Sequence, residues 1–413
     1  MLYEADIFAY ASRGKSRTCT RISFRSRCRR LQKELALIHR CVIDRAGAHI
    51  AHDTMQDGRA FDRDQSLDVV RGIAILLAMG WHLNAYTGLP LLDWLLQPGR
   101  SFGWAGVDLF FVLSGFLIGG IVLKEREVSG RFDAGRFLGR RAIRLWPVVW
   151  VFLAAQLVLA DKSWTTFLFQ NLLHVQNYWV SSISHLWSLA VEEHFYVILA
   201  VVFLLMNSLR DITRWMFWGL LGVIAIAPLL RAGGLLFGAD YQALQWQTQY
   251  RVDALACGVL LSLVKLKWPD AFRALQKAWP LHVVIIGAGV AFLLLFEKDS
   301  ELGATFGFTV AYLVSASLLL LIYKSEIIRR GGLFFRPLSL IGLYSYSMYV
   351  WHMAASNLAV KLAAKVGLVS PAIIVPLKYG AAIGVAMMAY YAVEKPVMRL
   401  RDKIFPAKVH VSV

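Results

Sequence analysis

Long apolar runs, each interrupted by few charged residues, constrain this chain more than any other feature. A helix that crosses a bilayer needs about 20 mostly apolar residues. Ten stretches approach this length, near 67–86, 104–123, 145–160, 187–206, 215–230, 252–264, 281–296, 305–323, 338–358 and 372–393. The run at 252–264 is long enough only if Arg251 and Asp253 enter the membrane. The pattern predicts an all-α, polytopic membrane bundle of about ten transmembrane helices.

Composition agrees with a membrane protein and excludes other sources of the positive charge. Of 413 residues, 58% are hydrophobic and 17% charged, the mean hydropathy is +0.54, and the net charge is +17. Nucleic-acid-binding tails are not this apolar, so we expect a lipid bilayer and no nucleic acid as partner. The four cysteines lack metal-ligand spacing, and no metal is expected.

The Lys and Arg residues between the apolar runs predict the orientation. Positive residues are retained in cytoplasmic loops. With the N-terminus inside, the inner loops after the first span carry 22 Lys and Arg and the outer segments carry seven. The sequence therefore predicts a multi-pass protein of the inner (plasma) membrane with both termini in the cytoplasm.

Residues 1–54 form a separate basic extension without an apolar run long enough for a signal peptide. Three interpretations are open: a disordered cytoplasmic arm, a segment attracted to anionic lipid, or an upstream extension created by a misassigned start. We favour the last, with Met55 as the true start. The rest divides into a lead-in (55–66), a membrane domain (67–397) and a cytoplasmic tail (398–413).

The first apolar run contains two ionisable residues, Arg71 and His82, eleven positions apart. At 100° per residue they share one face of a helix, separated by about 16 Å along its axis. Each alone has a structural explanation, a snorkelling arginine or a satisfied core histidine. Their alignment favours a functional site, because charged groups inside a membrane usually serve one. A neutral imidazole is also a suitable general base near pH 7.

Further polar residues recur at the ends and interiors of other spans. Asp108 and Ser114 lie in the second span, where Ser114-Gly115 permits close helix approach, and Glu192 and Glu193 lie in the fourth. Adjacent residues diverge by 100°, so the two glutamates should serve different neighbours. A basic cluster precedes the third span: Arg140, Arg141 and Arg144. It is either a positive-inside anchor or a site for a partner with several phosphates.

Taken in order, these motifs resemble the membrane-bound acyltransferase family 3, whose members O-acylate sugars and other hydroxyl acceptors. The matching segments are Leu67–Ala74 with His82, Gly106–Ile118, Phe137–Pro147, Trp187–Tyr196, Arg251–Gly258, and Ser345–His352 with Glu394-Lys395-Pro396. Each motif is weak alone, but their number, order and spacing are specific. Because no hydrolase-like domain follows the last span, we expect a stand-alone member.

The resemblance implies acyl-CoA, with acetyl as the expected acyl group, as cytoplasmic donor and a hydroxyl of a cell-envelope or secreted glycan as acceptor. His82 would be the general base or a proton shuttle, and Arg71 would hold the coenzyme or orient the histidine. The cluster Arg140, Arg141 and Arg144 would meet the coenzyme's phosphates.

The remaining candidates are assigned more loosely. Asp108, Glu192 and Glu193 would shape the acceptor end or pair with a buried arginine, the two glutamates also being counted among the catalytic candidates. Substrate-binding or structural roles are expected for Asp68, Asp108, Ser114, Trp187, Arg251, Asp253 and His352.

Two other functions remain open on the sequence alone. Intramembrane charges and glutamate pairs also mark a proton-coupled transporter or flippase of a glycan or small molecule. A structural scaffold would tolerate replacement of both Arg71 and His82, which distinguishes it from the enzyme.

Overall fold

The fold of the chain is all-helical in the part that the structure describes. The computed structural model describes residues 64–83, 86–159, 164–179, 183–208 and 211–406, so the predictions for 1–54 and for the end of the tail lie outside it. No strand occurs within these ranges, which confirms the predicted all-α class.

The α-helices, in chain order, are α2 (Gln65–Leu83), α3 (Pro90–Phe102), α4 (Gly106–Ser129), α5 (Ala134–Leu159), α6 (Trp164–Leu172), α7 (Trp187–Leu205), α8 (Ile212–Leu236), α9 (Tyr241–Trp246), α10 (Val252–Lys267), α11 (Pro269–Lys277), α12 (Trp279–Leu295), α13 (Phe308–Ile322), α14 (Glu326–Arg330), α15 (Gly332–Leu343), α16 (Ser345–Lys365), α17 (Pro371–Ala389) and α18 (Lys395–Ile404). Short 3-10 turns include η1 (Gly103–Ala105), η2 (Ser184–Leu186), η3 (Met206–Ser208) and η4 (Thr248–Tyr250), and π-helical turns are η5 (Gly303–Gly307) and η6 (Tyr390–Glu394).

Membrane-spanning helices are fewer by length and composition than the sequence predicts. Among the described residues, seven helical segments are long and apolar enough to cross a bilayer, or eight if α11 and α12, bent by 64°, count as one. The other predicted spans fall on α10, α12 and the α15–α16 pair. At 16 residues, α10 measures about 24 Å at 1.5 Å per residue, shorter than the ~30 Å hydrocarbon core. The structure thus supports a multi-pass protein with seven or eight spans by this measure.

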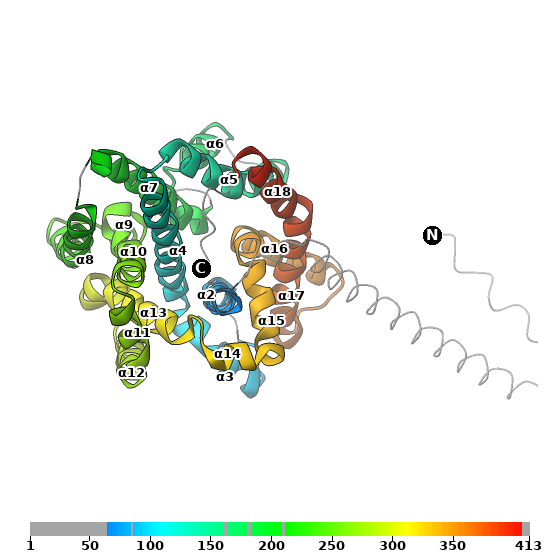
Figure 1. The fold of residues 1–413 in the computed structure, drawn as a ribbon. Helices are drawn as coiled ribbons and strands as arrows, with labels where there is room; N and C mark the ends of the chain where they lie inside the picture. The colour runs from blue at the N-terminus through cyan, green and yellow to red at the C-terminus, as the bar shows by residue number, and fades with distance from the viewer. Residues whose placement is uncertain (1–63, 84–85, 160–163, 180–182, 209–210, 407–413) are drawn as a thin grey trace, which may run out of the picture. The chain divides into compact units, whose positions relative to one another are not determined.

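Helix α2 lies inside the bundle, where α4, α13, α15 and α16 surround it (Figure 1). Its contact with α15 is backbone to backbone: a Cβ added to Gly342 would lie 1.8 Å from the carbonyl oxygen of Asp68. Small residues allow such approach between membrane helices. The helix that carries Arg71 and His82 is therefore held rigidly from several sides.

Helices α4 and α10 form a second close contact. A Cβ on Gly115 would lie 2.1 Å from the Leu255 carbonyl oxygen, and one on Gly258 would lie 2.1 Å from the Val112 carbonyl oxygen. The close approach predicted for Ser114-Gly115 is confirmed.

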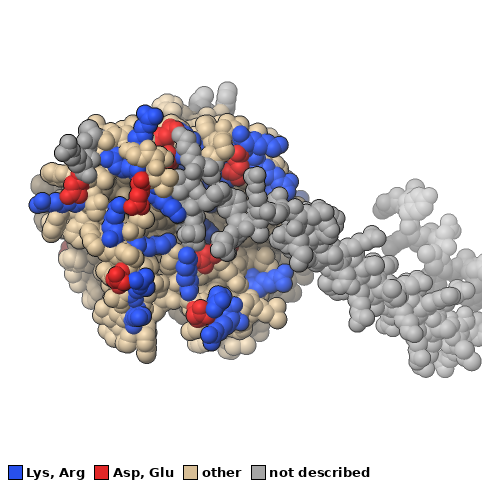
Figure 2. All heavy atoms as spheres, in the orientation of Figure 1, with Lys and Arg blue, Asp and Glu red and all other residues tan. Residues whose placement is uncertain are grey.

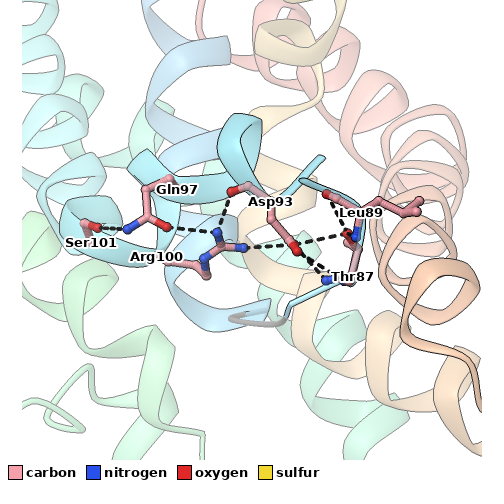
Figure 3. A network of polar contacts seen from close by, with 7 residues as sticks. Thr87, Leu89, Asp93, Gln97, Arg100 and Ser101 are labelled. Carbon is pink, nitrogen blue, oxygen red and sulfur yellow. Dashed lines mark hydrogen bonds and ion pairs between the residues drawn. The ribbon is translucent and has the colours of Figure 1, made fainter. Parts of the chain in front are cut away.

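The outer segment between the predicted spans at 67–86 and 104–123 contains α3, with Pro90 in its first turn. Asp93 accepts hydrogen bonds from the Thr87 backbone N–H at 2.7 Å and from its hydroxyl at 3.0 Å (Figure 3). Arg100 donates to Gln97 at 2.9 Å and to the Asp93 carbonyl oxygen. These bonds hold the turn at Thr87 against α3.

Charged side chains gather on one face of the molecule that can be seen directly (Figure 2). Lys and Arg side chains spread over the face seen in Figure 2, with Asp and Glu among them. Such a face fits loops rich in positive residues, and its assignment to the cytoplasm remains a prediction.

Candidate active site

His82 is the penultimate residue of α2, so it lies at the far end of this helix from Arg71. Two other histidines surround it: His185 from η2 and His352 from α16. Ring centroids lie 5.2 Å apart for His82 and His352, 5.1 Å for His185 and His352, and 6.3 Å for His82 and His185. His185 and His352 are buried, whereas His82 is partly accessible. We call these three residues the histidine cluster.

Hydrogen bonds hold His185 of the histidine cluster against α16, the helix that carries His352. The Tyr349 hydroxyl donates to the His185 carbonyl oxygen at 2.6 Å, and Ser188 donates to that hydroxyl at 2.6 Å. The His185 Nε2 lies 3.1 Å from the Val350 carbonyl oxygen. His185 is absent from the site residues predicted from the sequence, although it lies two positions before a matched motif. No helical periodicity relates it to His82, so only the packing of η2 reveals it.

Arg71 belongs to a different part of α2. It donates to Asp68 Oδ1 at 2.6 Å near the start of the helix. The helix is continuous from Gln65 to Leu83, so about 16 Å along its axis separates Arg71 from His82. Arg71 therefore cannot orient His82 by direct contact, which leaves coenzyme binding as its proposed role.

A polar stripe runs along α7 away from the histidine cluster. Ser188, Glu192 and Tyr196 follow at intervals of four residues and share one face over about 12 Å. The Tyr196 hydroxyl donates to Glu192 at 2.8 Å, and Ser114 Oγ lies 2.9 Å from that hydroxyl. Glu193 is also buried, close to Trp146. The predicted divergence of the two glutamates agrees with these different neighbours.

Near Glu192 lies an arginine cluster, which we define as Arg140, Arg141, Arg144 and Arg401. Asp402 pairs with Arg140 at 3.0 Å and with Arg401 at 2.9 Å. Arg141 and Arg144 form no ion pair within 4.0 Å to any residue of the described ranges, yet both act electrostatically on Glu192. Arg401 is absent from the predicted site residues because it lies in the segment predicted as a cytoplasmic tail, 398–413. Partly buried guanidinium groups without a direct counter-ion are suited to bind phosphate.

Two buried ion pairs form a third polar region. Arg251 donates to Asp108 at 2.7 Å and Arg231 donates to Asp253 at 2.8 Å, and all four side chains are at most 2% exposed. The Arg251 guanidinium lies 5.4 Å from the Trp187 ring. Asp108 thus pairs with a buried arginine, which is one of the two alternatives stated for it.

Arg231 is the residue of this region that the sequence analysis missed. The predicted span ended at residue 230, which placed Arg231 in an outer segment. Helix α8 instead continues to Leu236 and carries Arg231 inside the bundle. There it also donates to the carbonyl oxygens of Thr305 and Tyr250, at 2.9 and 2.7 Å.

Metal-binding geometry is a separate question for a site with three histidines. Within the described ranges, no group of three or more His, Cys, Asp or Glu side chains is arranged to hold a metal ion.

Comparison with known proteins identifies the family. A family model described as an acyltransferase domain matches residues 64–391. A protein of Staphylococcus aureus (strain COL), provisionally named an O-acetyltransferase, is 30% identical over 323 residues, which cover 70% of this chain and 50% of the relative. The O-acetyltransferase OatA of Staphylococcus aureus (strain NCTC 8325 / PS 47) is 27% identical over 322 residues, 69% of this chain and 49% of the relative.

The relatives and the family model are matched over different shares of their length. The chain spans about half the length of the curated relatives that it matches. No solved structure matches the chain. The family model, in contrast, covers most of the residues that the structure describes, including the histidine cluster and Arg71. The chain therefore belongs to the acyltransferase domain family that its sequence motifs resemble.

Proposed function

We propose that the protein is a membrane O-acyltransferase that moves an acyl group, with acetyl as the expected one, from cytoplasmic acyl-CoA to a hydroxyl of a cell-envelope or secreted glycan. The relatives named O-acetyltransferases support acetyl transfer to oxygen. The observation that carries the proposal is the histidine cluster, in which a partly accessible His82 is packed against two buried imidazoles.

His82 is the proposed general base. A hydroxyl gains nucleophilicity when a neutral imidazole accepts its proton as it attacks. The hydroxyl oxygen forms a bond to the acyl carbonyl carbon, the C–S bond of the thioester breaks, and the thiolate leaves. The proton that His82 accepted then protonates the thiolate, so the products are an ester and free coenzyme A.

The arginine cluster is the proposed site for the anionic part of the donor. Arg141 and Arg144 provide guanidinium groups without a carboxylate partner in the described part of the chain, and phosphate can fill both in bidentate geometry. The α7 stripe connects this cluster with the histidine cluster, because Ser188 contacts Tyr349 at one end and Glu192 lies near Arg144 further along the helix. Donor and acceptor would therefore meet along α7.

A transfer assay tests the proposal. The full-length protein in proteoliposomes is supplied with radiolabelled acetyl-CoA and glycan extracted from a deletion strain, and label in the glycan is measured. His82→Ala should abolish transfer while the variant accumulates and elutes from size exclusion as the wild type does. The matched control is His282→Ala, which removes a buried histidine of α12 bonded to the Leu275 carbonyl oxygen and should leave transfer intact.

Two outcomes would contradict the proposal. A wild-type protein that moves glycan across the bilayer without forming any acylated product is a transporter. Full transfer by His82→Ala would show that the histidine cluster is not the catalytic site. Mass spectrometry of envelope polysaccharide from the deletion strain adds the chemical identity, because loss of one acyl unit names the group and its acceptor together.

A further inference from the structure

His352, one of the two buried histidines of the cluster, has a defined proton position. His352 Nδ1 lies 2.8 Å from the Tyr349 carbonyl oxygen and 3.2 Å from the Met348 carbonyl oxygen. A carbonyl oxygen only accepts hydrogen bonds, so Nδ1 must carry the proton. In a neutral ring the other nitrogen, Nε2, is then a bare acceptor.

This Nε2 atom has no hydrogen-bond partner among the residues that the structure describes, and the side chain is 0% exposed. A buried polar atom without a partner costs about 1–3 kcal/mol. A donor that can reach Nε2 would therefore be favoured there.

His82 lies at the distance at which it can be that donor. An N–H···N bond of about 2.9 Å between two imidazoles, with about 1.1 Å from each nitrogen to its ring centroid, gives a centroid separation near 5 Å. The observed separation of His82 and His352 is 5.2 Å, with the ring planes inclined by 46°. Rotation about the broad χ2 torsion of His82 completes the bond. His185 lies as close to His352, at 5.1 Å, but its Nε2 faces the Val350 carbonyl oxygen and must carry the proton. The neutral His185 ring then has no second N–H to donate to His352.

We propose that His352 is a positioning residue for His82: its Nε2 accepts a hydrogen bond from one ring nitrogen of His82 and so leaves the other nitrogen bare to take the proton of the acceptor hydroxyl. The inference rests on the proposed function and assigns a residue that acts through the general base. When His82 becomes an imidazolium, the same bond stabilises its positive charge, because a charged donor strengthens a hydrogen bond. No carboxylate is needed for this role.

Kinetics of His352 variants test the inference. His352→Phe keeps an aromatic ring but removes the acceptor, and we expect kcat to fall by about 10- to 100-fold with the KM for acetyl-CoA unchanged. His352→Gln supplies a side-chain carbonyl acceptor and should recover most of this loss. The matched control is His282→Phe, a similar replacement of a buried histidine outside the cluster, which should keep the wild-type kcat.

A spectroscopic measurement tests the hydrogen bond without relying on activity. In bilayers containing protein labelled with ¹⁵N-histidine, the signals of His82 and His352 are assigned by their loss in His82→Asn and His352→Gln. The wild type should show one tautomer of His82 and a scalar coupling between its ring nitrogen and His352 Nε2. In His352→Phe, His82 should populate both tautomers.

The outcomes separate the inference from the proposed function. A wild-type kcat in His352→Phe, or the absence of the nitrogen–nitrogen coupling in the wild type, overturns the positioning role and leaves acyl transfer intact. If the wild type transfers no acyl group, the proposed function fails, and the coupling still decides whether His352 orients His82. If His352→Phe does not accumulate, the wild-type coupling and the kcat of His352→Gln decide the question.

Discussion

Removal of one charge from the buried Asp108–Arg251 pair should destabilise the protein more than removal of both. The four charges of Asp108, Arg251, Asp253 and Arg231 sum to zero inside the bundle, so a single replacement leaves one uncompensated buried charge. Such a loss costs about 3–5 kcal/mol. The Arg251 guanidinium also lies 3.9 Å from the centre of the Phe308 ring. This cation–π contact offsets about 1 kcal/mol of the cost when Asp108 is lost.

We therefore expect Asp108→Leu to lower the free energy of unfolding by about 3 kcal/mol and Arg251→Met by about 4 kcal/mol. The double variant removes both charges, leaves the Arg231–Asp253 pair in place, and should lie within about 1 kcal/mol of the wild type. The coupling free energy of this double-mutant cycle is then about 7 kcal/mol.

Unfolding by sodium dodecyl sulfate in mixed micelles, followed by tryptophan fluorescence, measures these differences. Glu326→Gln is the control, because its pair with Arg329 is solvent-exposed and should contribute nothing measurable. Additive effects in the double variant, or single variants as stable as the wild type, would refute the reasoning that the pair is a compensated buried unit. Loss of acyl transfer in a stable double variant would instead assign the pair to substrate binding.

Three further predictions follow from particular residues. Arg144→Gln should raise the KM for acetyl-CoA about tenfold with little change in kcat, whereas Arg330→Gln, at an exposed position, should change neither in the transfer assay. Gly115→Val should lower the free energy of unfolding by about 1–3 kcal/mol or more, because its Cβ would lie 2.1 Å from the Leu255 carbonyl oxygen. The control for this unfolding measurement is Gly287→Val, because no neighbour lies within 4 Å of a Cβ at that position. Burial lowers the pKa of His174 to about 4, so between about pH 6.5 and pH 4 the unfolded chain binds a proton at this residue that the folded chain does not. The free energy of unfolding should therefore decline as the pH falls through this range. His174→Gln should flatten that decline in unfolding titrations, and an unchanged slope would contradict the prediction.

The fold class could be predicted from the sequence because hydropathy is a local property. Apolar runs of sufficient length identify helices wherever they pack, and a glycine beside Ser114 already indicated the close approach of α4 to its neighbour. The ends of the helices and the number of membrane spans could be predicted less well from the sequence. The run at 252–264 reads as a span by its composition, but α10 ends after 16 residues, and α8 extends past the predicted end of its run because paired Arg231 can remain inside the bundle.

Candidate residues could be selected from the sequence one helix at a time, since periodicity relates positions only within a helix. Helical periodicity placed Arg71 and His82 on one stripe. The hydropathy of the spans identified Asp108 and Arg251 as charges that a membrane would exclude unless they were paired. It could not show which arginine compensates which carboxylate, because the partners are 143 residues apart in the chain.

The tertiary structure alone decided what surrounds His82. Packing of η2 and α16 against the end of α2 brings His185 and His352 to the ring, from positions 103 and 270 residues later in the chain. Sequence determined that this protein is a helical membrane protein with a histidine in its first span, because burial of apolar helices depends on local composition. The assembly of the histidine cluster depends on contacts between distant segments, which only the folded chain specifies.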